Sequence, residues 1–202
     1  MMTSYRNRML SCMSTSLDRQ RRFLGTLVRE PLVVGAVAPS SRRLAGHMVA
    51  DIVPGSRVIE LGAGTGAVTR AILESGVSAA DLLVIEQNEA FSEMLRKRFP
   101  GIGVITGNAL GLNRHAGALP GPADFVVSGL PLLLFTPGRK LRLLHQVFSV
   151  LTEEGAFHQF TYGGRCPIQR AVLQRLGLKA TLLRFTPINV PPAFVYRLQR
   201  RR

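Results

Sequence analysis

The chain has 202 residues, with 26 Lys and Arg against 12 Asp and Glu, which gives a formal net charge of +14. Hydrophobic residues make up 46% and charged residues 19%, a balance that is typical of a globular protein and excludes a disordered chain. The length fits one domain with a sizeable core. The charge indicates a polyanionic partner, either nucleic acid or an anionic lipid surface, unless it only reflects an arginine-rich soluble surface.

Any association with a membrane is expected to be peripheral. No apolar stretch approaches the roughly 20 residues that span a bilayer. Arg6 and Arg8 interrupt the N-terminus, which lacks the apolar core of a signal peptide. Cys12 and Cys166 have no metal-ligand spacing around them, so we expect no metal site. One disulfide is compatible with the sequence, but a reduced cytoplasmic protein is the simpler interpretation.

Residues 1–55 are predicted to form a helical arm ahead of the main domain, residues 56–202. Leu17–Arg29 is predicted to be a basic amphipathic helix that lies on a membrane surface. Its membrane-binding residues are expected to be Arg19, Arg21, Arg22, Phe23 and Arg29. The alternative is a lid over a bound ligand, and one helix can serve both roles. A second helix is predicted over Arg42–Ile52, beginning at Pro39-Ser40-Ser41 and ending before Pro54-Gly55.

From residue 56 onward, short apolar runs alternate with helical patterns. Strands are predicted at Arg57–Leu61, Leu82–Glu86, Gly103–Thr106, Ala123–Ser128 and Gly155–Thr161. Helices are predicted at Gly66–Ser75, Asn88–Arg98, Pro137–Leu151 and Pro167–Leu176. Ala180–Phe185 and Ala193–Leu198 are predicted to form a closing antiparallel pair. This order predicts an α/β fold, a doubly wound Rossmann-like sheet of seven strands with helices on both faces.

The segment Val58–Gly66 combines a strand, a glycine-rich turn and the start of a helix. Its glycines let the chain turn tightly and present backbone N–H groups to a ligand. The spacing is Glu-x-Gly-x-Gly-x-Gly from Glu60, whereas a dinucleotide site uses Gly-x-Gly-x-x-Gly. Glu60 would repel a diphosphate, but it suits the amino group of a methionine moiety. The pattern resembles the first motif of S-adenosylmethionine-dependent methyltransferases.

Two further polar positions follow the next two predicted strands. Glu86 ends the second strand, where a carboxylate can accept both hydroxyls of a ribose. Asn108 follows the third strand, where many methyltransferases carry Asp against the adenine amino group. The resemblance therefore implies that S-adenosylmethionine binds here and leaves as S-adenosylhomocysteine. The cofactor-binding residues that it implies are Ser40, Ser41, Glu60, Gly62, Ala63, Gly64, Gly66, Glu86, Gln87, Asn108, Ala109 and Ser128. A nucleotide-binding fold with another ligand, or with none, is the alternative.

The segment after the fourth predicted strand bears on the substrate. Ser128–Phe135 is similar to the region in which adenine-N6 methyltransferases carry Asn-Pro-Pro-Tyr or Asn-Leu-Pro-Tyr. Gly129 and Leu132 stand at the positions of the Asn and the Tyr, so both groups that hold a flipped base are missing. We expect an apolar floor suited to an aliphatic substrate. This argues against an rRNA adenine dimethylase, whose overall pattern the chain otherwise resembles.

Residues 20–198 resemble the bacterial phospholipid N-methyltransferase family. The resemblance rests on the glycine motif and on Val34–Ser41, Ser128–Pro131, Tyr162–Ile168 and Asn189–Ala193. It implies methyl transfer to the amine of phosphatidylethanolamine and its methylated intermediates, toward phosphatidylcholine. The implied partners are phosphatidylethanolamine and an anionic phospholipid surface, without nucleic acid or metal. The implied location is the inner face of the cytoplasmic membrane.

The substrate amine must lose a proton before it attacks, because an alkylamine titrates near the lysine value of about 10. Tyr162, Ser128 and His158 are the candidate catalytic residues at the ends of the fourth and fifth strands. Tyr162 is the first choice, as hydrogen-bond partner, proton route or cation–π partner of the amine. The alternatives are that Tyr162 caps a buried strand end and that His158 is an ordinary core or surface histidine.

The predicted substrate-binding residues are Tyr162, Arg165, Asn189, Leu130 and Pro131. Arg165 would bind the lipid phosphodiester, unless it is an ordinary solvated arginine. Two other classes of function fit part of the pattern. An rRNA or tRNA adenine N-methyltransferase would suit the charge, but the chain has no Trp and only three Tyr for base stacking. A non-catalytic binding module would have no chemical need for the glycine turn and its two acids.

Overall fold

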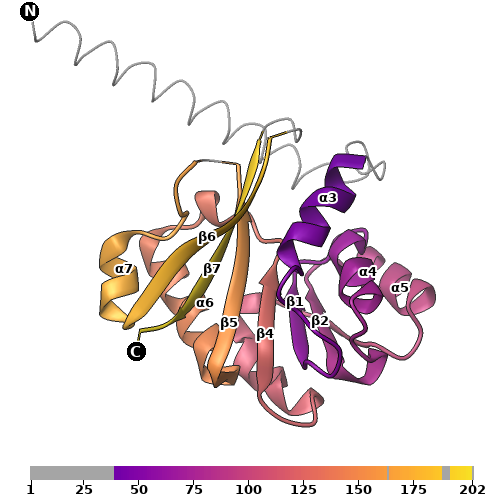
Figure 1. Ribbon diagram of the computed structural model, residues 1–202. Helices are drawn as coiled ribbons and strands as arrows, with labels where there is room; N and C mark the ends of the chain where they lie inside the picture. Colours follow the sequence, from indigo (N-terminus) through magenta and orange to yellow (C-terminus); the bar gives the residue numbers. More distant parts are fainter. Residues whose placement is uncertain (1–38, 163, 188–191, 202) are drawn as a thin grey trace, which may run out of the picture. The chain divides into compact units, whose positions relative to one another are not determined.

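The computed structural model describes residues 39–162, 164–187 and 192–201. These residues form a seven-stranded sheet with the strand order β3-β2-β1-β4-β5-β7-β6 (Figure 1). The parallel strands are β1 (Val58–Leu61), β2 (Leu82–Glu86), β3 (Gly103–Thr106), β4 (Ala123–Ser128) and β5 (Leu151–Thr161). β6 (Leu178–Thr186) and β7 (Ala193–Arg200) complete the sheet as antiparallel strands. The predicted fold class is confirmed.

Helices cover both faces of the sheet. The α-helices of the described residues are α3 (Pro39–Met48), α4 (Ala67–Glu74), α5 (Glu89–Arg98), α6 (Pro137–Val150) and α7 (Arg170–Arg175). The 3-10 segments are η1 (Ala79–Asp81), η2 (Ala109–Ala118) and η3 (Leu132–Leu134). Figure 1 shows α3, α4 and α5 grouped together and α6 and α7 on the other side of the sheet.

The core has two halves, because successive side chains of a strand point to opposite faces. In β2, Leu83 and Ile85 join the cluster that includes the buried residues of η2, α6 and α7. Leu82 and Val84 join the cluster that includes those of α3, α4 and α5. Every residue of β1 and β2 is therefore buried, as expected for central parallel strands.

Three elements differ from the sequence-based expectation. Helix α3 ends at Met48 rather than Ile52. The Met48 carbonyl accepts a hydrogen bond from Nδ1 of His158 (2.8 Å), and Ile52 N donates to Val49 O instead of continuing the helix. β5 begins at Leu151, directly after α6, and its pairing with β4 shifts register between Ala123 and Phe125. Helix α7 begins at Arg170, because Pro167 and Ile168 are buried in an irregular segment that precedes it.

The N-terminal part of the sequence is described only from α3 onward. Residues 37–202 form one compact unit, and α3 packs against α4 and against β5, β6 and β7. The division at residue 55 stays a prediction. The predicted helix Leu17–Arg29, with its membrane-binding residues Arg19, Arg21, Arg22, Phe23 and Arg29, lies outside the described residues. Within the described part, no helix is long and apolar enough to cross a bilayer.

Candidate active site

The glycine turn after β1 needs glycine at three positions for different physical reasons. Gly62, Gly64 and Gly66 have φ values of 71°, 53° and 82°, a region that favours glycine. A Cβ at Gly66 would lie 2.6 Å from the Phe99 ring, and one at Gly62 would lie 2.9 Å from Leu130 Cδ2. A Cβ at Gly64 would meet nothing within 4 Å. The turn therefore packs tightly against other residues at Gly62 and Gly66, whereas Gly64 faces open space.

Glu60 lies directly before this turn and is only 1% exposed. Its Oε2 accepts a hydrogen bond from the Thr69 hydroxyl at 2.6 Å, which fixes the carboxyl group against α4. Burial raises the pKa of Glu60 to about 7, the Thr69 hydrogen bond opposes that shift, and the nearby charge of Glu86 adds to it. A cationic ligand group at this position would stabilise the charged carboxylate.

Glu86 holds the turn from the end of β2. Its Oε2 accepts from Gly64 N at 2.9 Å, and its Oε1 accepts from Asn88 N at 2.8 Å. A carboxylate offers about four acceptor positions, so each oxygen keeps one for another donor. Backbone donors therefore fix both oxygens, which is the arrangement that the predicted contact with two ribose hydroxyls requires. The predicted partners Glu60, Gly64 and Glu86 are thus brought together by the structure.

The other predicted cofactor residues lie in three places. Gln87 is exposed directly after β2, and Ala63 packs at the edge of the core cluster with α3, α4 and α5. Asn108 is exposed after β3, where its Oδ1 accepts from Leu110 N at 2.9 Å, and Ala109 is buried beside it. That oxygen has a second lone pair for an adenine amino group. Ser40 and Ser41 lie in the first turn of α3, and their side chains lie outside the described part.

Gly129 brings the end of β4 against the glycine turn. Its N–H donates to Leu61 O at 2.8 Å, and a Cβ at Gly129 would lie 2.5 Å from Gly62 O. Ser128 is fully buried, and its Oγ accepts from Leu130 N at 3.2 Å. Leu130 and Pro131 are half-buried beside the turn. Leu132 was expected to contribute to an apolar floor, but it is 1% exposed and packs into the core instead.

Gln159 is a site residue that the sequence analysis missed. It is fully buried in β5 opposite Ser128, and its Nε2 donates to Leu130 O at 3.0 Å and to Phe160 O at 2.7 Å. Gln159 therefore fixes the segment that faces the glycine turn, and its Oε1 has no hydrogen-bond partner among the described residues. The signal was a polar residue in an apolar strand, two positions before the end of that strand.

Tyr162 follows β5 at the same edge of the sheet. It is half-buried, packs against the core cluster that also holds Ala63, and meets Phe160 edge-on with ring centroids 5.3 Å apart. Arg165 is exposed three residues later. Asn189, the remaining predicted substrate-binding residue, lies outside the described residues. The structure therefore places Tyr162 at the edge of the sheet where the parallel strands end, the edge that also carries the glycine turn, and Arg165 is exposed on the adjoining surface.

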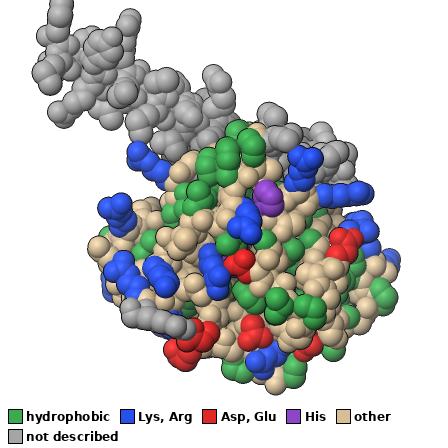
Figure 2. Space-filling model, in the orientation of Figure 1, with side chains coloured by type: hydrophobic (Ala, Val, Ile, Leu, Met, Phe, Trp, Pro, Cys, Tyr) green, Lys and Arg blue, Asp and Glu red, His purple; other side chains and the backbone are tan. Residues whose placement is uncertain are grey.

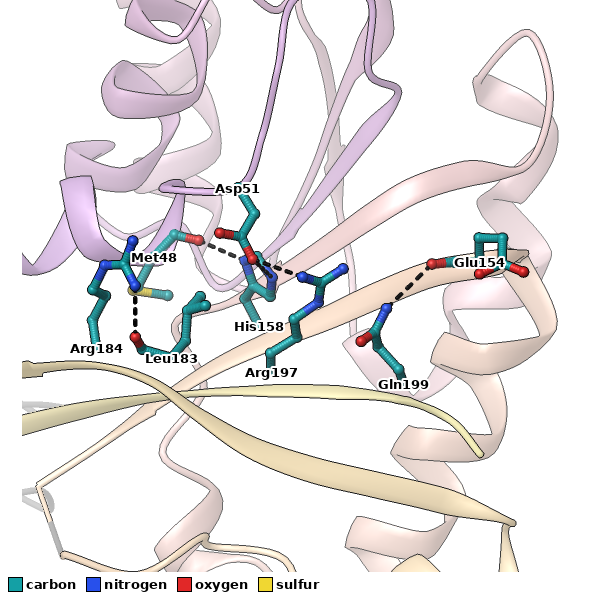
Figure 3. Close-up of polar contacts among 8 residues, drawn as sticks. All are labelled: Met48, Asp51, Glu154, His158, Leu183, Arg184, Arg197 and Gln199. Atoms are coloured by element: carbon teal, nitrogen blue, oxygen red, sulfur yellow. Dashed lines mark hydrogen bonds and ion pairs between the residues drawn. The ribbon is translucent and has the colours of Figure 1, made fainter. Parts of the chain in front are cut away.

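His158 is separated from these residues and faces α3 (Figure 3). It is fully buried, its Nδ1 donates to Met48 O, and its Nε2 lies 4.0 Å from Asp51 Oδ2. Arg197 binds the same Asp51 oxygen at 2.9 Å. Burial lowers the pKa of His158, so its imidazole is neutral near pH 7. These contacts make His158 a link between α3 and the sheet.

Glu60 predicts a pH-dependent stability. Because its pKa is raised from 4.5 to about 7, the folded protein binds more protons than the unfolded chain in this range. The stabilisation is complete below pH 4.5 and is lost as the pH rises through 7, a change of about 3 kcal/mol in all. From pH 5 to pH 8, we expect the free energy of unfolding of the wild type to fall by about 2 kcal/mol more than that of Glu60→Gln, as measured by urea unfolding. Parallel pH profiles for the two proteins would contradict this role of Glu60.

Comparison with known proteins identifies the family. No family model matches the sequence. An ornithine lipid N-methyltransferase of Singulisphaera acidiphila is 33% identical over 183 residues, which cover 86% of this chain and 92% of that protein. A ribosomal RNA small subunit methyltransferase A of Chlorobium chlorochromatii is 32% identical over 84 residues, 42% of this chain and 31% of that protein.

A solved structure supports the fold. The 1,6-didemethyltoxoflavin-N1-methyltransferase of Burkholderia thailandensis, with 1,6-didemethyltoxoflavin and S-adenosylhomocysteine bound, matches with a TM-score of 0.62 at 14% identity. The match covers 94% of this chain and 89% of that one. The fold and the site define an S-adenosylmethionine-dependent methyltransferase. Within this class, the chain belongs to the lipid N-methyltransferase family that includes the ornithine lipid N-methyltransferase of Singulisphaera acidiphila.

Proposed function

We propose that this protein methylates the primary amine of a membrane-lipid headgroup, with phosphatidylethanolamine as the first candidate substrate. The observation that carries the proposal is the close approach of Gly129 to the glycine turn, because it leaves no space for a base-holding side chain. Ornithine lipid is the second candidate, since the relative named for it matches nearly the whole chain. Both headgroups present a primary amine near an anionic group.

An RNA adenine substrate fits this site poorly. The Asn of the adenine-N6 motif would stand at Gly129, where even a Cβ would lie 2.5 Å from a backbone oxygen. The aromatic residue of that motif is replaced by Leu132, which is buried in the core. Neither the hydrogen bond nor the stacking contact to a flipped base is available at these positions. The match to the ribosomal RNA methyltransferase is limited to less than half of this chain.

The proposed cofactor residues fall into two groups, which would bind the adenosine part and the methionine part of S-adenosylmethionine. Glu86 would accept the ribose hydroxyls, Glu60 would face the amino group of the methionine moiety, and the N–H groups of the glycine turn would bind its carboxylate. Asn108 would accept from the adenine amino group. The bound cofactor supplies an electrophilic methyl group on a sulfonium. The remaining task of the chain is to hold a neutral amine in line with that methyl group.

Tyr162 is the residue that we assign to the amine. Its half-buried position at the end of β5 removes water from the nitrogen, which favours the neutral form. The hydroxyl can accept a hydrogen bond from the amine or pass its proton outward, and the ring can face the methylated cation. Arg165, exposed on the adjoining surface, would bind the headgroup anion, with Leu130 and Pro131 beside the substrate. The predicted basic helix Leu17–Arg29 would hold the enzyme at the inner membrane face.

A headgroup panel tests the proposal. The full chain would be incubated with radiolabelled S-adenosylmethionine and vesicles that contain phosphatidylglycerol with phosphatidylethanolamine, ornithine lipid or phosphatidylcholine. We expect label in the lipid phase with the first or second additive and none with phosphatidylcholine, whose nitrogen cannot accept a further methyl group. Absence of lipid labelling with every additive, despite cofactor binding, would refute the proposal.

Replacement of Tyr162 is expected to lower the rate of transfer rather than cofactor binding. Tyr162→Leu removes both the hydroxyl and the ring, and we expect kcat to fall by about tenfold to a hundredfold. Tyr162→Phe separates the two roles, since it loses the hydroxyl and keeps the ring. Single-turnover rates at saturating cofactor would measure the effect. Wild-type rates for both variants would remove Tyr162 from the chemistry and leave it as a residue that caps β5.

A further inference from the structure

Two exposed hydrophobic side chains lie side by side on the edge strand β6. Leu182 is 49% exposed and Phe185 is 45% exposed, although both belong to a strand of the sheet. Leu182 pairs with Tyr196 and Phe185 pairs with Phe194, and these two partners are two residues apart on β7. Leu182 and Phe185 therefore point to the same face, where the Phe185 and Phe194 rings stack with centroids 4.6 Å apart. We call Leu182, Phe185 and Phe194 the hairpin patch.

The hairpin patch lies at the substrate edge of the sheet. Phe194 pairs with Thr161, which directly precedes Tyr162. A Cβ at Gly164 would be 3.6 Å from the Phe194 ring, and the Tyr196 hydroxyl donates to Gly164 O at 3.2 Å. The patch thus borders the segment that carries the proposed substrate residues Tyr162 and Arg165.

The surroundings of the hairpin patch are cationic. Arg165 is exposed one residue after Gly164, next to the patch. Arg184 is exposed on β6 but pairs with Val195, so its side chain lies on the other face of the strand, where His47 of α3 binds Thr186 (2.8 Å). Burial lowers the pKa of His47, and the charges of Arg184 and Arg43 lower it further, so the surface on the α3 side of β6 is cationic as well. Figure 2 shows green hydrophobic side chains with blue Lys and Arg side chains over the upper ends of β6 and β7, and red side chains only lower on this face.

The described acidic residues lie elsewhere. Glu153 and Glu154 are at the start of β5 and Asp124 is at the start of β4, both at the opposite edge of the sheet. Asp51 is bound by Arg197. Glu60 and Glu86 are buried. The remaining described acids belong to the segments around α4, η1 and α5, toward the β3 end of the sheet and away from β6. A hydrophobic surface with cationic neighbours and no nearby acid fits an anionic lipid interface.

We propose that the hairpin patch is a membrane-contact surface, in which Leu182, Phe185 and Phe194 enter the headgroup layer of an anionic membrane while Arg165 beside them meets lipid phosphates. The proposal rests on the proposed function, because the patch adjoins the residues assigned to the lipid headgroup. The hairpin patch would give the enzyme a membrane contact of its own, separate from the predicted helix Leu17–Arg29. Such a contact orients Tyr162 toward the membrane surface, where the amines are.

The test compares two substituted forms of the full chain with a matched control. Leu182→Gln and the double variant Leu182→Gln/Phe185→Gln remove exposed apolar surface from the patch. Val53→Gln removes a similar group that is 59% exposed but lies before β1, at the opposite edge of the sheet. Binding to vesicles of phosphatidylglycerol and phosphatidylethanolamine would be measured by co-sedimentation. We expect at least tenfold weaker binding for the double variant, about threefold for Leu182→Gln, and wild-type binding for Val53→Gln.

Three results would overturn the proposal. These are wild-type vesicle binding by the double variant, an equal loss with Val53→Gln, or a wild-type dimer that the variants convert to a monomer without a change in vesicle binding. Because the Phe185 ring stacks on Phe194, a melting curve checks folding, and Leu182→Gln, which leaves that stack intact, carries the test if the double variant unfolds. Methylation of short-chain phosphatidylethanolamine dispersed in detergent separates the membrane contact from the proposed function. Variants that methylate this dispersed lipid at the wild-type rate but bind vesicles weakly support the patch. If even the wild type does not methylate the dispersed lipid, the proposed function is refuted, but the vesicle contact is not.

Discussion

Replacement of Glu86 by alanine is expected to weaken S-adenosylmethionine binding at least a hundredfold, which corresponds to about 2.7 kcal/mol. The variant loses the carboxylate that we assign to both ribose hydroxyls. It also releases the N–H groups of Gly64 and Asn88, which now donate to the two carboxylate oxygens. The glycine turn would therefore lose its anchor to β2 together with its contact to the ligand.

Isothermal titration with S-adenosylhomocysteine would measure this effect. Glu89→Ala is the matched control, because Glu89 is an exposed acid three residues further along, in the first turn of α5. The control changes the net charge by the same amount without touching the turn, so its affinity should stay within about twofold of the wild type. An affinity of Glu86→Ala within threefold of the wild type would show that the ribose is held elsewhere.

Replacement of Gly129 by alanine is expected to have the second large effect. Its Cβ would lie 2.5 Å from Gly62 O and 3.6 Å from Leu61 O, both backbone atoms that cannot rotate away. Either β4 or the glycine turn must shift, and such overpacking typically costs about 1–3 kcal/mol. We therefore expect a free energy of unfolding lowered by about 2 kcal/mol and a clear loss of cofactor affinity.

The control for Gly129→Ala is Gly138→Ala. Gly138 lies in the first turn of α6, and a Cβ there would meet nothing within 4 Å. That substitution should leave cofactor binding unchanged and stabilise the helix slightly, since alanine has a higher helix propensity than glycine. Equal effects of the two substitutions in urea unfolding and in titration would mean that the approach of Gly129 to Gly62 does not constrain the site.

The parts of the site that lie at strand ends could be predicted from the sequence. Apolar runs ending in Glu60 and Glu86 predict parallel strands, and such strands bring their carboxyl ends to one edge of a sheet. The glycine spacing then predicts which edge holds the ligand. Local patterns alone are therefore enough to predict where the turn and both acids lie in the sheet.

The contacts that depend on register and packing could not be predicted in this way. Gln159 reaches Leu130 because β5 pairs beside β4, and its role is set by a partner 29 positions away in the sequence. His158 was a candidate at a strand end, but its alternation in β5 turns it toward Met48 and α3. Leu132 has the same apolar character in a substrate wall and in a core, and only the packing decides between them.

The most direct test of the central claim is a competition in one vessel. Radiolabelled S-adenosylmethionine would be supplied with the full chain, anionic vesicles rich in phosphatidylethanolamine or ornithine lipid, and unmodified small-subunit ribosomal RNA, followed by separation of lipid from RNA. We predict that the label enters the lipid as N-methylated headgroup and that the RNA stays unlabelled. Label in the RNA with unlabelled lipid would contradict the assignment of this site to a lipid amine.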